Sequence, residues 1–256
     1  MARVWTGRIK SLLARAGLGV YRLRGRYVQD GLSTVHPAQF QRDPEFRSAY
    51  DRGVQASQGV DPEFEWRVHT ALWAAESALR VPGDFVECGV NAGFMSSAIM
   101  QRLNWNKVAR RFYLIDTFAG PLLSQFSEEE VLKRRLAIAE DAIQAGAYVT
   151  DFERIRANFD EWPNALPVQG AVPDILPSLG IETVAFLHID LNCALPERAA
   201  LEFFWDRLSP GAVVLLDDYG YRGHECQREA IDAAARAKNV RVLSIPTGQG
   251  IIIKLR

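Results

Sequence analysis

The sequence predicts an α/β fold in which a mostly parallel sheet is covered by helices on both faces. From residue 63 onward, short apolar segments alternate with segments whose apolar side chains recur at helical spacing. This alternation is typical of consecutive strand-helix-strand units, whose parallel sheets are buried on both sides. The last two apolar segments, 240–245 and 250–255, are close enough to pair as an antiparallel hairpin.

The remaining elements follow in order along the chain. The expected strands are 84–90, 111–118, 166–172, 183–191 and 212–216. The expected helices are 63–79, 92–103, 148–159, 196–208 and 224–238. Ser209, Pro210 and Gly211 predict a turn, and the glycines and prolines of residues 28–62 predict an irregular connection. A polar insert covers about 119–145. Two parts are therefore expected: an N-terminal segment, 1–62, and a main domain, 63–256.

Composition and charge exclude several classes of protein. Of the 256 residues, 48% are hydrophobic and 24% charged, which is typical of a globular chain and not of a disordered one. The net charge of −1 argues against a nucleic acid as partner. Cys88, Cys193 and Cys226 are widely spaced, which favours the reducing cytoplasm over a disulfide framework.

The N-terminal segment is unusually basic. Residues 1–29 carry seven basic side chains and no acidic one, with Trp5, Ile9, Leu12 and Leu13 at helical spacing between them. The apolar runs are too short for a secretory signal. A basic amphipathic helix packed on its own domain, a frayed arm and a contact with an anionic membrane surface all remain open.

The loop after the first strand of the main domain carries an acid and two glycines. Glu87, Gly89 and Gly93 form an E-x-G-x-x-x-G pattern that opens a helix. Glycines let the backbone approach a ligand closely, and the start of a helix offers free N–H groups. The pattern differs from the G-x-G-x-x-G of dinucleotide-binding enzymes, and its carboxylate suits a cationic ligand. A plain strand-turn-helix corner is the alternative.

Further acids end the following strands, where ligands bind in such sheets. Asp116 lies 23 residues after Gly93, close to the spacing at which an acid binds ribose hydroxyls; a solvated acid is the alternative. Asp190 and the pair Asp217 and Asp218 end two later strands. Three converging carboxylates call for a cation, and hard oxygen ligands favour Mg²⁺ or Ca²⁺. Helix capping is the alternative for the pair.

Other candidates have weaker support. Asp174 follows the third strand and could join the same region. His188 lies two residues before Asp190 and shares its side of the strand, either to orient a ligand or as a hydrogen-bonded core residue. His224 begins a helix near the acidic pair, as a proton acceptor or as a surface residue.

Five segments in order resemble the macrocin O-methyltransferase (TylF) family over about residues 65–256. They are GDFVECGVNAG, FYLIDTFAG, VQGAVPDILP, FLHIDLN and LSPGAVVLLDDYG. The resemblance implies a Rossmann-like class I methyltransferase with a seven-stranded sheet whose last strand is antiparallel. It also implies S-adenosylmethionine as cofactor, Mg²⁺ as metal, and a hydroxyl of a sugar, glycosylated natural product or glycan as acceptor. Assembly into a homo-oligomer is a further implication.

The resemblance assigns roles to particular residues. Glu87, Gly89 and Gly93 would surround the methionine part of the cofactor, and Asp116 would hold the ribose with Thr117 beside it. Gln169, Gly170 and Ala171 would lie near the adenine. Asp190, Asp217 and Asp218 would bind Mg²⁺, with Asp190 as general base. The insert 119–145 would form a lid that sets acceptor choice.

The chain departs from the family at one place. Members commonly carry D-x-D-x-Y after the fourth strand, whereas this chain has Asp190, Leu191, Asn192 and Cys193. Asn192 removes a charge and Cys193 removes bulk, so the acceptor pocket is expected to differ. Two other readings remain: an NAD(P)-dependent oxidoreductase on a related fold, and a non-catalytic nucleotide-binding protein recruited to membranes.

Overall fold

A computed structural model of the chain describes residues 11–13, 15 and 27–255. The chain divides into two units, and the boundary in the sequence falls between residues 39 and 40. In the first unit, β1 (Tyr27–Gln29) and β2 (Leu32–Thr34) form a small antiparallel hairpin. Most of the basic helix expected within residues 1–29 lies outside the described residues. The second unit contains the main sheet and all of the sites below.

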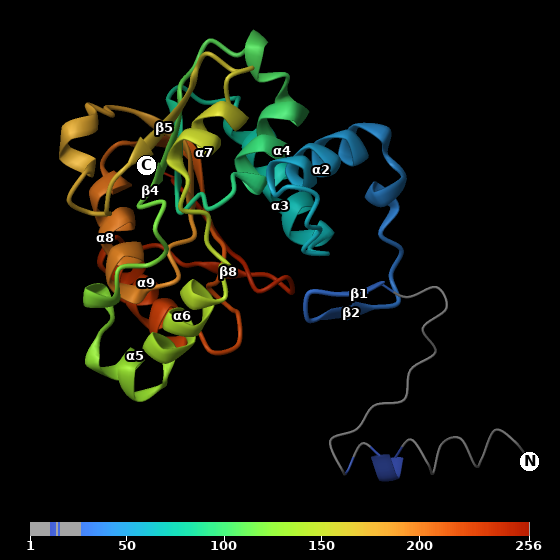
Figure 1. Cartoon of the computed structure of the whole chain (residues 1–256), viewed down its shortest axis with the longest axis vertical. Helices are drawn as coiled ribbons and strands as arrows, with labels where there is room; N and C mark the ends of the chain where they lie inside the picture. The colour runs from blue at the N-terminus through green and yellow to red at the C-terminus, as the bar shows by residue number, and fades with distance from the viewer. Residues whose placement is uncertain (1–10, 14, 16–26, 256) are drawn as a thin grey trace, which may run out of the picture. The chain divides into compact units, whose positions relative to one another are not determined.

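The main sheet has seven strands in the order β5-β4-β3-β6-β7-β9-β8 (Figure 1). β9 is antiparallel to both of its neighbours, and the other pairs are parallel. The mixed sheet with its terminal hairpin is therefore confirmed. The strands are β3 (Asp84–Cys88), β4 (Phe112–Asp116), β5 (Ala165–Gln169), β6 (Val184–Ile189), β7 (Leu208–Leu216), β8 (Leu243–Ser244) and β9 (Gly250–Ile253).

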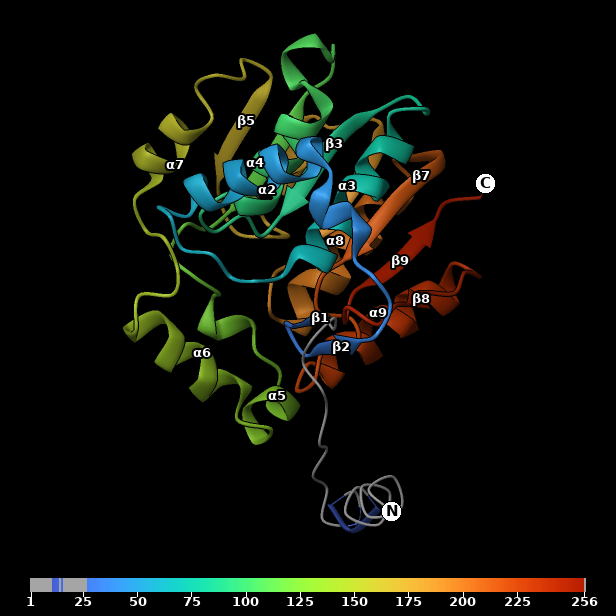
Figure 2. The same ribbon diagram turned by 90° about the vertical axis from the view of Figure 1, so that its right-hand side faces the viewer.

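Helices cover both faces of this sheet (Figure 2). The α-helices of this unit are α2 (Pro44–Ala56), α3 (Glu65–Ala78), α4 (Phe94–Leu103), α5 (Glu128–Leu132), α6 (Arg135–Gln144), α7 (Phe152–Asn158), α8 (Ala194–Trp205) and α9 (Glu225–Ala237). Alternate side chains of each strand face opposite layers. Phe85 and Phe186 pack with α2, α3 and α4, whereas Val86 and Leu187 pack with α8 and α9. Every residue of β6 is buried, as a central strand covered on both faces requires.

The helix α2 was not expected, because residues 28–62 were predicted to be an irregular connection. Asp43 caps this helix by accepting from the Glu45 N–H, and Pro44 opens it. Gly53, which suggested a loop, lies inside the helix and lets it approach α4. A Cβ on Gly53 would stand 2.5 Å from a ring carbon of Phe94. The glycine therefore marks close helix packing and not a turn.

Two smaller differences concern the bounds of elements, and a third concerns the insert. Residues 209–211, predicted to be a turn, belong to β7, where the pairing with β6 shifts register. The helix expected from residue 148 begins at Phe152 because Asp151 caps it. The insert 119–145 contains the short helices α5 and α6, which lie together beyond the sheet in both views (Figures 1 and 2).

Candidate active site

Two cavities lie at the carboxyl ends of the parallel strands. The larger measures about 630 Å³ and is lined by residues of β3, β6 and β7 together with the loops before α3 and α7. The smaller measures about 100 Å³ and lies over the ends of β4 and β5. Gly89, Asn91, Tyr148 and Asp190 line both cavities. Two adjacent cavities therefore lie at the edge of the sheet where the sequence predicts a ligand.

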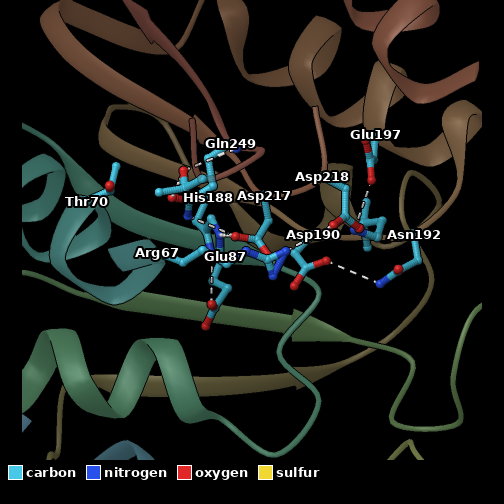
Figure 3. Close-up of polar contacts among 12 residues, drawn as sticks. Arg67, Thr70, Glu87, His188, Asp190, Asn192, Glu197, Asp217, Asp218 and Gln249 are labelled. Carbon is cyan, nitrogen blue, oxygen red and sulfur yellow. Dashed lines mark hydrogen bonds and ion pairs between the residues drawn. The ribbon is translucent and has the colours of Figure 1, made fainter. Parts of the chain in front are cut away.

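Glu87 has one satisfied and one unsatisfied oxygen at the wall of the larger cavity. Its side chain is buried, and Oε1 lies 2.8 Å from Nδ1 of His188 (Figure 3). Oε2 is buried and has no hydrogen-bond partner among the described residues. A buried carboxylate oxygen without a donor is costly unless a ligand supplies one. This atom therefore indicates a position for a cationic or hydrogen-bond-donating group.

The two predicted glycines of this loop serve different purposes. Gly89 has a φ of +92°, and a Cβ there would stand 1.7 Å from the carbonyl oxygen of Asp190. This close approach holds the ends of β3 and β6 together at the cavity wall. Gly93 also has a positive φ, but a Cβ there would meet the ring of Phe159. It lines neither cavity, so in this structure it serves helix packing.

Asp116 organises the loop that carries these glycines. Its Oδ2 accepts from the backbone N–H groups of Val90 at 2.6 Å and Asn91 at 2.9 Å. Its Oδ1 accepts from the N–H of Phe118 at 2.7 Å. Thr117 donates to the carbonyl of Gly120 at 2.6 Å. Asp116 and Thr117 both line the smaller cavity, which confirms their expected proximity to Gly89 and leaves their ligand role to be tested.

The three residues expected near the adenine end β5. Gly170 lines the smaller cavity, whereas Gln169 and Ala171 are absent from its wall. The Gln169 side chain donates weakly to the carbonyl of Thr117, at 3.4 Å. The structure therefore places one of the three directly on the cavity and the other two beside it.

Asp190, Asp217 and Asp218 converge as the sequence predicted (Figure 3). Asp190 and Asp217 line the larger cavity. Arg67, on α3, bridges the adjacent pair: its Nη1 lies 3.0 Å from Oδ2 of Asp217 and its Nη2 3.3 Å from Oδ1 of Asp218. Arg67 itself was missed, because within the sequence it is one more charge on an amphipathic helix.

Three further residues lie close to the carboxylates of Asp217 and Asp218. Gln249 donates to Oδ1 of Asp217 at 2.9 Å, and Nε2 of His188 lies 3.8 Å from the same oxygen. Nδ1 of His224 lies 3.1 Å from Oδ2 of Asp218. His188 and His224 are thus buried beside the site carboxylates, and the contact of His188 with Glu87 fits both readings given for it.

The crowded charges shift protonation in opposite directions. Burial and the neighbouring Asp217 and Asp218 raise the pKa of Asp190 well above its ordinary value. Burial alone would raise the pKa of Asp217, but Arg67 and His188 hold it below the usual range. Burial opposes protonation of His188, yet Asp217 and Glu87 raise its pKa to about 10. The centre of the site is therefore an ion network of Arg67, His188 and Asp217, beside which Asp190 favours its protonated, neutral form.

The donor chemistry of this cluster fits Mg²⁺. That ion takes oxygen ligands, binds one or two protein carboxylates and keeps several waters. In the described part of the chain, no three His, Cys, Asp or Glu side chains are arranged to enclose a metal ion. Arg67 draws two of the three carboxylates toward itself. A divalent cation therefore fits the oxygens present provided that Arg67 releases one of them.

Asn192 and Cys193, which stand where the family commonly has an aspartate and an aromatic residue, both make contacts near Asp190. Nδ2 of Asn192 donates to Oδ1 of Asp190 at 3.2 Å, so the amide holds the carboxylate. Cys193 is buried, and its thiol donates to the carbonyl of Gln125 at 3.1 Å. The small side chain thereby lets the insert approach the start of α8.

Glu130 anchors the insert at that point. It is fully buried on α5, accepts from the N–H and hydroxyl of Ser127 at 2.8 Å each, and accepts from the N–H of Ala194 at 2.9 Å. The first contacts form a capping box on α5. The last joins α5 to the first turn of α8. The insert is therefore tied to the start of α8 through a buried carboxylate, which the sequence analysis did not single out within the polar insert.

Solved methyltransferase structures share this architecture. The O-methyltransferase NovP aligns over 86% of this chain and 100% of its own, with a TM-score of 0.66 and 18% identity. The calicheamicin methyltransferase CalS11 aligns over 91% and 97%, with a TM-score of 0.55 and 15% identity. At these identities the likeness concerns the fold, which is that of the Rossmann-like O-methyltransferases.

The family assignment comes from the sequence. The family model for macrocin-O-methyltransferase (TylF) matches residues 68–244, and the chain belongs to this family. A curated relative from Streptomyces olivaceus is 32% identical over 162 residues. It is named 8-demethyl-8-(2,3-dimethoxy-alpha-L-rhamnosyl)-tetracenomycin-C 4'-O-methyltransferase, and the match spans 60% of each chain. The resemblance to the family is confirmed.

Proposed function

We propose that this protein transfers a methyl group from S-adenosylmethionine to a hydroxyl of a sugar or glycosylated natural product, with Mg²⁺ at its carboxylate cluster. The observation that carries the proposal is that the two cavities lie side by side and share Gly89, Asn91, Tyr148 and Asp190 in their walls. An elongated cofactor would occupy the smaller cavity and reach the larger one past these residues. Its reactive end would then lie beside the carboxylates and the acceptor space.

The cofactor side is supported by the acceptors and glycines at the strand ends. The orphaned Oε2 of Glu87 would accept from the amino group of the methionine part. Gly89 gives the backbone the close approach that such a ligand needs. Asp116 and Thr117 would bind the ribose hydroxyls, and Gly170, flanked by Gln169 and Ala171, would border the adenine. Gly93 would contribute indirectly, because it lets the start of α4 pack against Phe159.

The acceptor side lies in the larger cavity. Its outer wall includes Gln58, Thr150 and Arg154, whose amide, hydroxyl and guanidinium groups suit an acceptor rich in hydroxyls. Phe64 and Val60 add apolar surface. This mixture fits a sugar attached to a less polar body, the chemistry that the name of the Streptomyces relative describes for that enzyme.

The chemistry needs a proton acceptor and charge stabilisation, because a sugar hydroxyl is a poor nucleophile. Bound Mg²⁺, held by Asp190 with Asp217 and Asp218, supplies stabilisation of the negative charge that develops on the acceptor oxygen. Asp190 takes the hydroxyl proton on a carboxylate oxygen. Asn192 keeps that carboxylate oriented, and the insert 119–145 limits access of water and selects acceptors.

The other two readings have less support. Membership in a methyltransferase family does not support the hypothesis of an NAD(P)-dependent oxidoreductase. The non-catalytic reading depended on Asn192, and this side chain supports Asp190 instead of replacing it. Within residues 11–13, 15 and 27–255, no helix is long and apolar enough to cross a membrane. Membrane contact through residues 1–29, a cytoplasmic location and homo-oligomerisation stay predictions.

The proposal is tested by a transfer assay. Purified protein, S-adenosylmethionine and Mg²⁺ are incubated with rhamnosides, other glycosides and catechol, and products are analysed by mass spectrometry. We expect one added methyl group on a glycoside, located on its sugar by fragmentation. Methylation of catechol alone would contradict the glycosyl acceptor while leaving the methyltransferase assignment in place.

A further inference from the structure

Arg67 contacts two of the carboxylates that a bound metal would also contact. It stands in the first turns of α3, and its side chain is 11% exposed at the wall of the larger cavity. The guanidinium lies 5.0 Å from the ring centre of Tyr221 and 5.8 Å from that of Phe64. Aromatic contacts and two carboxylates thus fix a permanent cation inside the site (Figure 3).

The carboxylates that Arg67 bridges have partners at both oxygens. Oδ2 of Asp217 pairs with Arg67 and Oδ1 with Gln249. Oδ1 of Asp218 pairs with Arg67, and Oδ2 lies beside His224. By contrast, the hydrogen bond of Asp190 within the cluster comes from the neutral Asn192. A cation shared between Asp190 and the pair would therefore compete with these partners for the same oxygens.

We infer that Arg67 is a resident competitor of the divalent ion: it balances Asp217 and Asp218 when the metal is absent and yields at least one of their oxygens when the metal binds. This inference rests on the proposed metal site. Two cations at contact distance from one carboxylate oxygen repel each other. Arg67 is the group expected to yield because it contacts both carboxylates, whereas Gln249 is neutral and His188 lies 3.8 Å from Asp217.

The competition has a measurable consequence. Part of the metal's binding free energy is used to break a buried ion pair, so Arg67 weakens the affinity for the metal. In return it keeps two adjacent carboxylates charged and ordered before the metal arrives. Arg67 is in this sense a positioning residue for the cluster, and removing it should tighten metal binding while it destabilises the metal-free protein.

The test is a calorimetric titration of the full chain with Mn²⁺ alone, after removal of metals by a chelator. We expect Arg67→Gln to bind Mn²⁺ about tenfold more tightly than the unmodified chain, the scale set by loss of one close ion pair. Arg67→Lys keeps the charge without the fork and should give an intermediate affinity. Arg67→Lys also keeps the test open if Arg67→Gln does not fold. In thermal unfolding, metal-free Arg67→Gln should melt lower than the unmodified chain and gain more from Mn²⁺.

Arg154 is the matched control, since it is a second cation on the wall of the same cavity. Among the described residues it makes no ion pair with Asp217 or Asp218. Arg154→Gln therefore measures how much the loss of a nearby positive charge, without an ion pair, changes the Mn²⁺ affinity. Its Mn²⁺ affinity should stay within about twofold of the unmodified chain, because separated charges are screened.

The outcomes separate this inference from the proposal beneath it. Mn²⁺ binding that is unchanged or weaker in both Arg67 variants would overturn the competition and leave the metal site standing. Loss of S-adenosylhomocysteine binding in Arg67→Gln, with unchanged Mn²⁺ affinity, would make Arg67 a cofactor ligand instead. Absence of Mn²⁺ binding in the unmodified chain and in every variant would overturn the metal site itself, and the inference with it.

Discussion

Gly89 and Asp190 approach each other so closely that a single added carbon has no room: a Cβ on residue 89 would stand 1.7 Å from the carbonyl oxygen of residue 190. This contact joins the loop after β3 to the end of β6. It places the glycine loop against the carboxylate cluster, and both residues line both cavities.

We therefore expect Gly89→Ala to abolish cofactor binding and to destabilise the fold by more than the roughly 1–2 kcal/mol that a left-handed backbone costs an L-residue. The backbone must move, because its neighbour is a main-chain atom. Thermal unfolding and titration with S-adenosylhomocysteine measure both effects. Gly180→Ala is the control: it shares the positive φ but has no atom within 4 Å of the added carbon. Equal losses in both variants would refute the special role of the contact.

Asp190→Asn should abolish methyl transfer and leave the affinity for S-adenosylhomocysteine largely intact. The amide cannot take the hydroxyl proton, while its size and its contact with Asn192 are preserved. Turnover and calorimetry are compared with Asp174→Asn, whose carboxylate lines neither cavity. Near-normal turnover of Asp190→Asn would rule out the assigned role of Asp190.

Glu87→Gln should weaken S-adenosylhomocysteine binding at least about tenfold, because a hydrogen bond to a charged group contributes roughly 1.5–3 kcal/mol. The amide oxygen can keep the contact with His188, so the change isolates the charge at the cavity wall. Calorimetric titration measures the affinity. An unchanged affinity would mean that Glu87 serves His188 alone.

Glu130→Ala should loosen the insert. The substitution leaves the N–H of Ala194 without its acceptor, at a cost of roughly 1–3 kcal/mol, and also removes the capping box. Hydrogen exchange is expected to rise across residues 119–145, with β3 and β6 unaffected, and KM for the acceptor should rise more than KM for the cofactor. The neighbouring Glu129→Ala removes only an exposed pair with Lys133 and should change neither. Uniform exchange changes across the whole sheet would contradict a local anchoring role.

The order of strands and the meeting of their terminal acids could be predicted because both follow from local patterns and general topology. Apolar segments alternating with helices imply a parallel sheet, and its strand ends share one edge. Asp190, Asp217 and Asp218 therefore came together as expected. The hairpin of β8 and β9 followed from two apolar segments close in sequence.

Other features depend on contacts between distant residues and leave no local pattern. Arg67 and Asp218 are 151 positions apart, so their pairing could not be predicted. Gly53 was taken for a loop marker, whereas it makes room for an aromatic ring; Gly93 also makes room for one, and its role at the cofactor stays a prediction. The helix α2 did have a readable start at Asp43 and Pro44, but its interior glycine suggested a loop. Glycine alone does not distinguish a turn, a ligand contact and tight packing.

The most direct measurement is calorimetric titration of the purified chain with S-adenosylhomocysteine, with and without Mg²⁺, and with NAD⁺ as the comparison ligand. We expect binding of S-adenosylhomocysteine, no binding of NAD⁺, and a separate Mg²⁺ binding event that Asp217→Asn weakens. Binding of NAD⁺, or of neither nucleotide, would contradict the methyltransferase assignment of the two cavities.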